Sequence, residues 1–168
     1  MHLILRKLEL TDTDAAAIVH RAALLGAMPT FEGLHTPEED RRYFREIVFR
    51  TCETWGAFDE SSLVGIIAFR KGWIDQLYVA PNLQRRGIGT ALLNIARFAF
   101  SELSVWTFQR NMVARNFYEA RGFTKIKETD GAENEEREPD VLYFWSRNGT
   151  IGEREAEKHE QIFKEGVD

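Results

Sequence analysis

The apolar residues of the chain gather in short runs that alternate with segments of helical period, and each pattern predicts one kind of element. Seven short apolar runs predict strands, at residues 3–10, 52–58, 63–69, 73–80, 103–108, 123–129 and 141–146. The polar tetrapeptide at residues 59–62 separates the second run from the third, so these two strands are predicted to form a hairpin.

The segments between these strands carry helix signals. Thr11 is predicted to cap a helix over residues 14–27, whose first turn contains the acidic Asp14. A second helix is predicted to follow Thr36, because Pro37 occupies its first position and Glu39 its capping-box position.

A third helix is predicted to begin at Gly87, because apolar residues then recur at the spacing of one helical face. These residues are Ile88, Ala91, Leu92, Ile95, Ala96 and Ala99. A fourth helix is predicted over residues 111–122. Helices interspersed among strands in this order predict a mixed α/β (α+β) fold in one domain over residues 1–147, followed by a polar, helix-prone tail at residues 148–168.

Composition and charge limit the classes of function. Lys and Arg total 22 and Asp and Glu total 27, which gives a net charge of −5 and disfavours a broad nucleic-acid-binding face. The apolar runs are too short to predict a signal peptide or a membrane span. The single cysteine, Cys52, cannot form an internal disulfide, which fits a cytoplasmic protein with a buried structural thiol.

Two glycines and two arginines stand where the strand at residues 73–80 gives way to the third helix, in the sequence QRRGIG (residues 84–89). The first N–H groups of a helix lack intrahelical acceptors, the helix dipole makes this end positive, and glycine lets an anion approach the backbone. Because arginine adds charge suited to phosphate oxygens, this junction predicts a ligand that carries a diphosphate.

The same junction has other interpretations. Gly87 and Gly89 would also serve close packing of helix on strand, with both arginines solvated. A Rossmann fingerprint needs a third glycine where this chain has Leu92, and a Walker A loop needs G-x-x-x-x-G-K-[ST], which the sequence lacks.

A second pair of residues marks the fourth predicted helix. Asn111 and Tyr118 are seven residues apart, so they share one face of a helix about 10.5 Å apart along its axis. A tyrosine phenol, with an ordinary pKa of about 10, is protonated at neutral pH and can donate to a developing anion. Taken alone, the pair more often serves as an N-cap and a half-buried aromatic residue.

Together the two segments resemble the GNAT superfamily of acyl-CoA-dependent N-acetyltransferases. The segment LYVAPNLQRRGIGTALL (residues 77–93) resembles motif A of that family, Q/R-x-x-G-x-G/A with the preceding strand, and NMVARNFYEARGF (residues 111–123) resembles motif B, N-x-x-A-x-x-F-Y-x-x-x-G-F. All fixed positions of motif B are matched: Asn111, Ala114, Phe117, Tyr118, Gly122 and Phe123. The likeness extends over residues 3–146, and its closing segment is similar to an uncharacterised bacterial subgroup.

The resemblance implies the GNAT fold, a central, mixed, mostly antiparallel sheet of about seven strands, splayed between strands 4 and 5 and flanked by about four helices. It implies acetyl-CoA as co-substrate in that opening, with the pantetheine and acetyl group bonded to the backbone of Leu77, Tyr78 and Val79 and contacted by Asn111. It places the pyrophosphate against the following turn, formed by Arg85, Arg86, Gly87, Ile88, Gly89 and Thr90.

The implied reaction is direct attack of a primary amine, of a small molecule or a peptide amino terminus, on the thioester in a ternary complex. Tyr118 corresponds to the general acid of the family, and an N–H near Val79 to the donor that stabilises the oxyanion. The fifth-strand stretch VWTFQR has no carboxylate, so Asp75 on the fourth strand and an ordered water are the alternative bases. A regular strand would place Asp75 on the face of Leu77 and Val79, and a bulge would break that alternation.

Acceptor recognition is expected from Phe31 and His35 in the loop at residues 28–35, and from Tyr143 and the acidic segment before the last strand. That segment carries Glu135, Glu136 and Asp140, which would attract a cationic amine; a solvated acidic loop is the alternative.

Two functions therefore stay open at the level of sequence: an acetyltransferase, and a non-catalytic acyl-CoA-binding sensor of the same fold. The expected partners are acetyl-CoA, an amine acceptor and, in a homodimer, a second copy of the chain; nucleic acid and membrane are not expected. The histidines lack metal-ligand spacing, so no metal is expected.

Overall fold

The computed structural model of the chain describes residues 2–149. Its backbone divides into two compact units, Met1–Ala99 and Phe100–Asp168. The tail predicted at residues 148–168 lies outside the described residues, apart from Asn148 and Gly149.

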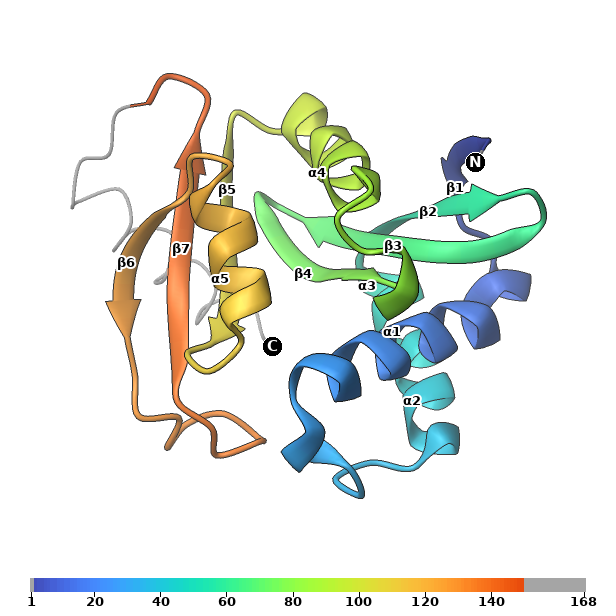
Figure 1. Cartoon of the computed structure of the whole chain (residues 1–168), viewed down its shortest axis with the longest axis horizontal. Helices are drawn as coiled ribbons and strands as arrows, with labels where there is room; N and C mark the ends of the chain where they lie inside the picture. Colours follow the sequence, from blue (N-terminus) through green and yellow to red (C-terminus); the bar gives the residue numbers. More distant parts are fainter. Residues whose placement is uncertain (1, 150–168) are drawn as a thin grey trace. The chain divides into compact units, whose positions relative to one another are not determined.

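The first unit contains four strands that pair antiparallel with their neighbours in chain order (Figure 1). These strands are β1 (Leu3–Lys7), β2 (Glu53–Asp59), β3 (Ser62–Arg70) and β4 (Trp73–Val79). The turn between β3 and β4 has positive φ at both central residues, Lys71 (47°) and Gly72 (79°), which matches the right-handed twist of paired strands.

Two helical stretches cover one face of this sheet. They are α1 (Thr13–Ala27), and the continuous stretch formed by α2 (Pro37–Tyr43), a π-helical segment (Phe44–Val48) and α3 (Phe49–Thr51). Small residues of α1 let the helix lie close to the sheet, and the core that results contains Ala16, Ala17, Val19, Phe44, Val48, Ile66 and Ala68.

Helix α4 (Ile88–Ala99) lies on the opposite face of the same sheet (Figure 1). Its buried residues are Ile88, Leu92, Leu93 and Ala96, so the predicted apolar face is confirmed at three positions and Leu93 extends it. Gly65 of β3 permits the contact, because a Cβ there would lie 3.0 Å from both Ile88 Cγ2 and Leu92 Cδ1. The approach of α4 to β3 therefore depends on a residue without a side chain.

Of the two N-caps predicted for the first two helices, the one at Thr36 is confirmed and the one at Thr11 is wrong. Thr36 Oγ1 accepts from the N–H of Glu39 at 3.2 Å, and Glu39 Oε2 accepts from the N–H of Thr36 at 2.7 Å. Thr11 does not cap α1, because the chain turns earlier, in a 3₁₀ segment at Leu10–Asp12. The Asp12 carboxylate stabilises that turn by accepting from the N–H of Glu9 at 2.8 Å and from Arg6 at 2.8 Å.

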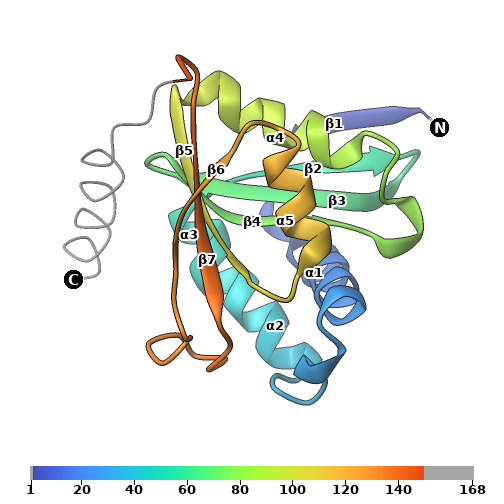
Figure 2. The same cartoon turned by 60° about the vertical axis from the view of Figure 1, so that its left-hand side comes forward.

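The second unit contains a three-stranded antiparallel sheet in which β7 pairs with both β5 and β6 (Figure 2). Its elements are β5 (Glu102–Phe108), α5 (Met112–Glu119), β6 (Thr124–Glu128) and β7 (Asp140–Ser146). Helix α5 packs on this sheet through Tyr118, which is 5% exposed and contacts Tyr143 of β7.

The seven predicted strands and their order among the helices are thus confirmed, and the first strand is shorter than predicted. It ends at Lys7 rather than residue 10, because Leu10 already belongs to the 3₁₀ turn. The predicted splay concerns strands 4 and 5, which belong to different units, and stays a prediction.

Candidate functional site

The turn between β4 and α4 has a backbone that few side chains tolerate. Arg85 has φ of 61° and Gly87 φ of 84°, both in the left-handed region. A Cβ on Gly87 would meet no heavy atom of the described residues within 4 Å, so glycine is required here by conformation and leaves open space beside the backbone. Gln84 fixes the start of the turn by donating from Nε2 to the carbonyl of Val79 at 3.1 Å.

Positive charge is available at this turn. Arg85 and Arg86 are exposed, and within residues 2–149 neither forms an ion pair or hydrogen bond. The first turn of α4 carries no acidic residue, and Ile88 anchors it in the core with 1% exposure. A helix N-terminus anchored by a buried residue, open space at Gly87 and two unengaged guanidinium groups therefore lie close together in the chain, which suits a diphosphate ligand.

Strand β4 is interrupted at Asp75. Ala68 pairs with Gln76 and Phe69 with Ile74, so Asp75 is the extra residue of a β-bulge. The regular alternation that would place Asp75 with Leu77 and Val79 fails here. Its carboxylate instead interacts with Cys52 and with Arg70, whose Nε donates to Oδ1 at 3.2 Å.

The second oxygen of this carboxylate, Oδ2, is buried and has no hydrogen-bond partner among the described residues. Burial raises the pKa of Asp75 above its ordinary value, against the opposing effect of Arg70. A carboxylate with a raised pKa and an unused oxygen is suited to accepting a proton.

Cys52 was predicted to be a buried structural thiol; it is half-buried, and its thiol has low reactivity. Burial, followed by the negative charge of Asp75, raises the pKa of its thiol to about 11, so the thiolate is rare at neutral pH. Neither Arg70 nor Cys52 was predicted to contact Asp75, although the tight turn between β3 and β4 brings Arg70 close to Asp75.

The loop between α1 and α2, which carries the predicted acceptor residues Phe31 and His35, is held by an ion pair. Arg21 Nη1 donates to Asp40 Oδ2 at 2.6 Å and to the carbonyl of His35 at 3.0 Å. Phe31 is 8% exposed and so serves the core of the loop, whereas His35 is partly exposed.

His20 of α1 lies against the ring of Tyr78, with centroids 4.7 Å apart in an edge-on arrangement. Burial lowers its pKa to about 4, so the imidazole is neutral at physiological pH. The described residues provide no partner for its Nδ1.

In the second unit, Asn111 caps α5, because its Oδ1 accepts from the N–H of Ala114 at 3.0 Å. The helix ends in a Schellman arrangement: the N–H of Phe123 donates to the carbonyl of Tyr118 at 3.1 Å, and that of Gly122 to the carbonyl of Glu119 at 3.1 Å. Gly122 has the positive φ (79°) that this ending requires.

This ending also explains the aromatic surroundings of Tyr118. Its ring packs edge-on against Phe123 (5.1 Å between centroids) and Phe117 (5.3 Å), and it stacks on Tyr143 (6.2 Å). Asn111 therefore has the predicted N-cap role, whereas Tyr118 is buried rather than half-buried, with aromatic rings on three sides.

The acidic loop before β7 is held together by its own polar groups. Asp140 accepts from Thr129 Oγ1 and from Asn134 Nδ2, and Arg110 forms an ion pair with Glu138. Gly131 is also required, because a Cβ there would lie 2.3 Å from the backbone of Glu138. Asp140 thus stabilises the loop, while Glu135 is exposed and Glu136 is partly exposed.

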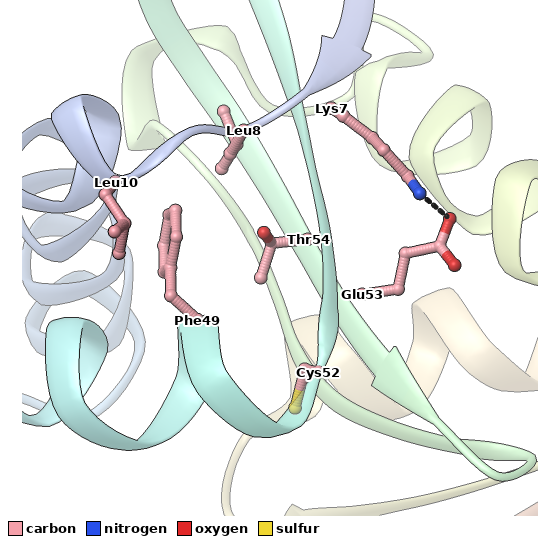
Figure 3. Close-up of a pocket in the computed structure, with 7 residues that line it drawn as sticks. All are labelled: Lys7, Leu8, Leu10, Phe49, Cys52, Glu53 and Thr54. Carbon is pink, nitrogen blue, oxygen red and sulfur yellow. Dashed lines mark ion pairs between the residues drawn. The ribbon is translucent and has the colours of Figure 1, made fainter.

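A groove of about 440 Å³ lies beside the start of β2 in the first unit and contains none of the predicted site residues (Figure 3). Leu8, Leu10 and Phe49 form its apolar wall, and the Lys7–Glu53 ion pair (3.4 Å) lies at its other side. Within residues 2–149 no three His, Cys, Asp or Glu side chains are placed to hold a metal ion. The helices of the same residues include none with the length and hydrophobicity of a membrane span.

A family model described as "Acetyltransferase (GNAT) family" matches residues 23–123 and so crosses the boundary between the two units. Among curated proteins, the peptidyl-lysine N-acetyltransferase YiaC of Escherichia coli is 31% identical over 80 residues, which are 47% of this chain and 55% of YiaC. The uncharacterised N-acetyltransferase YafP of the same organism is 34% identical over 45% of this chain and 49% of its own length. The chain thus spans about half the length of these relatives.

Solved structures match over more of the chain. The apo form of YjaB from Escherichia coli has a TM-score of 0.74 at 16% identity and covers 86% of this chain and 98% of its own. The PaiA N-acetyltransferase of Thermoplasma acidophilum, in complex with coenzyme A, has a TM-score of 0.64 at 22% identity and covers 87% and 99%. At these identities the likeness establishes the fold, which is the fold predicted from the two motifs.

The contact between Asp75 and Cys52 can be tested by thiol alkylation. A thiol with a pKa of about 11 should react with iodoacetamide at pH 8 about a hundredfold more slowly than an ordinary cysteine, because little thiolate is present. Asp75→Asn should lower the pKa of Cys52 and accelerate alkylation, whereas Asp59→Asn, at the far end of β2, should not. Mass spectrometry measures the rate of alkylation. Equal rates in the wild type and in Asp75→Asn would contradict this contact.

Proposed function

Since the chain belongs to the acetyltransferase (GNAT) family, we propose that it is an N-acetyltransferase that transfers an acetyl group from acetyl-CoA to a primary amine. The observation that carries this proposal is the turn at residues 85–89, where open backbone, a helix N-terminus and two unengaged arginines suit the pyrophosphate of acetyl-CoA. The coenzyme A complex of the PaiA relative supports this choice of donor.

In the proposed reaction, the neutral amine attacks the thioester carbonyl carbon, a C–N bond forms, and the carbonyl oxygen becomes an oxyanion. The oxyanion then collapses, the C–S bond breaks, and the thiolate takes a proton from Tyr118. The nitrogen, which became cationic on attack, loses one proton to water, and the Tyr118 phenolate regains its proton from water. The products are the amide and the free thiol. Backbone groups of Leu77, Tyr78 and Val79 are proposed to bind the pantetheine and acetyl group, with Asn111 at the pantetheine arm.

The acceptor is proposed to be a small-molecule amine or a peptide amine. Because the relative YiaC is a peptidyl-lysine N-acetyltransferase, lysine side chains of peptides are included among the acceptors to be tested. His35 and Glu136 are partly exposed and stay in the proposed acceptor region. Phe31 is proposed to shape the loop there from its core.

The donor site is tested by comparing the KM values of two thioester donors, acetyl-CoA and acetyl-pantetheine. Arg86→Ala should raise the KM for acetyl-CoA about ten- to a hundredfold, because a charge-assisted hydrogen bond contributes about 1.5–3 kcal/mol. The KM for acetyl-pantetheine, which has the same thioester but no pyrophosphate, should stay unchanged. Arg50→Ala, an exposed arginine of α3, is the matched control. An equal loss with both thioesters would rule out pyrophosphate binding by Arg86.

Tyr118→Phe removes the proposed proton donor and keeps the ring. We expect kcat to fall about a hundredfold, because general acids contribute at least about 10²-fold, while the calorimetric Kd for acetyl-CoA changes less than twofold. Thiol release across a panel of amines measures kcat. Unchanged turnover in this variant would refute the assignment of Tyr118.

Asp75 is the proposed base for the proton of the attacking ammonium, with an ordered water as the alternative. Burial raises the pKa of Asp75, so this carboxylate becomes protonated at a higher pH than an ordinary carboxylate does. Activity that depends on its charged form should therefore begin to fall at that higher pH when the solution is acidified. Asp75→Asn should lower kcat/KM at pH 7 at least tenfold and abolish this acidic limb. Asp59→Asn is the control. If Asp75→Asn has the same kcat/KM and the same pH–rate profile as this control, an ordered water rather than Asp75 is the base.

A further inference from the structure

Tyr143, which the sequence predicts on the acceptor side, is fully buried. It occupies the middle of β7 with 0% exposure, and its ring stacks on that of Tyr118, with 30° between the ring planes and 6.2 Å between centroids. A side chain with no exposed surface makes its contacts within the protein, and those of this phenol point to a second role.

The hydroxyl of Tyr143 is bound on both sides by helix α5. It donates to Glu119 Oε1 at 2.5 Å and accepts from Arg115 Nε at 3.2 Å. Arg115 and Glu119 are four residues apart and share one helical face, and Tyr118 lies in the turn between them. One strand residue therefore fixes the helical turn that carries the proposed acid.

Arg115 is itself anchored elsewhere in the second unit. Its Nη1 donates to the carbonyl of Gln109 at 3.1 Å. The side chain of Gln109 donates in turn to the carbonyls of Thr129 (2.8 Å) and Asp140 (3.0 Å), at the ends of β6 and β7. The bond between Arg115 and Tyr143 is thus one link in a network that joins α5 to the sheet.

The other aromatic neighbours of Tyr118 carry no hydroxyl, so their side chains cannot form the polar link that Tyr143 forms. Phe117 belongs to α5 and moves with Tyr118 if the helix shifts, whereas Phe123 lies four residues past the end of α5 and packs on Trp145 of β7. Tyr143 belongs to β7 and is held there by paired strands on both sides. Its ring and its hydroxyl both oppose a shift of Tyr118 relative to the sheet.

We propose that Tyr143 is a positioning residue for acetyl transfer, which acts by holding the Tyr118-bearing turn of α5 against strand β7. The inference rests on the proposed role of Tyr118 as proton donor. Proton transfer requires heavy atoms within about 3 Å, so a small shift of the helix lowers the rate without removing the acid.

The test is a double-mutant cycle of Tyr143→Phe and Tyr118→Phe. Tyr143→Phe keeps the stacked ring and frees Arg115 and Glu119 to pair with each other, so the protein should fold. We expect kcat to fall about three- to tenfold, with the KM for acetyl-CoA changed less than twofold. In the Tyr118→Phe background, Tyr143→Phe should have no further effect on kcat, because the group it positions is already absent.

Trp145→Phe is the matched control, because Trp145 lies two residues along β7 and packs on Phe123. It should lower the urea midpoint of unfolding and leave kcat unchanged. If Tyr143→Phe lowers kcat equally with and without the Tyr118 hydroxyl, or no more than Trp145→Phe does, the positioning role is overturned. Normal kcat in Tyr118→Phe alone would instead refute the acid, which separates failure of the proposed function from failure of this inference.

Discussion

The donor side of the proposed site depends on one close contact, between helix α4 and strand β3 at Gly65. Ile88 and Leu92 pack directly on the backbone of Gly65, where a methyl group would lie 3.0 Å from each of them. This contact holds the first turn of α4 in the core, so its N–H groups and the preceding Arg86 are presented by a rigid element. Binding an anion at such a turn requires little ordering, because the backbone is already fixed by packing.

A similar relation holds in the second unit, where the end of α5 fixes Tyr118. The positive φ of Gly122 lets Phe123 turn back onto the helix, and the same turn brings the Phe123 ring against the ring of Tyr118. The motif spacing F-Y-x-x-x-G-F is thereby explained by the geometry of a helix end. The residues that end the helix are thus also those that surround the proposed proton donor.

The parts that were predictable from sequence are those fixed by neighbours in the chain. The Thr36 capping box, the turn at Gly87 and the Asn111 cap depend on residues within four positions, and all three appear as predicted or in close agreement. The bulge at Asp75 and the burial of Tyr143 depend on strand pairing and on side chains 23 to 28 residues away, such as Cys52 and Arg115. Alternation along a single strand carries no information on such contacts. The sequence signal for the contacts of Tyr143 was the pair Arg115 and Glu119, four residues apart on α5. Such a pair of charges is typical of a solvent-exposed helix face and does not predict contact with a buried phenol.

The same distinction bears on how acceptor selectivity would arise. Counting charges predicted that the acidic loop attracts a cationic amine, yet Asp140 and Glu138 are engaged in bonds that hold the loop in shape. Beside the loop between α1 and α2, Asp40 of α2 likewise pairs with Arg21 of α1, which also binds the carbonyl of His35. Charged residues within one loop and beside the other thus stabilise backbone conformation, because buried carboxylates need partners. Within the acidic loop, Glu136 stays partly exposed, so it is a better candidate than Asp140 or Glu138 for the attraction of a cationic amine.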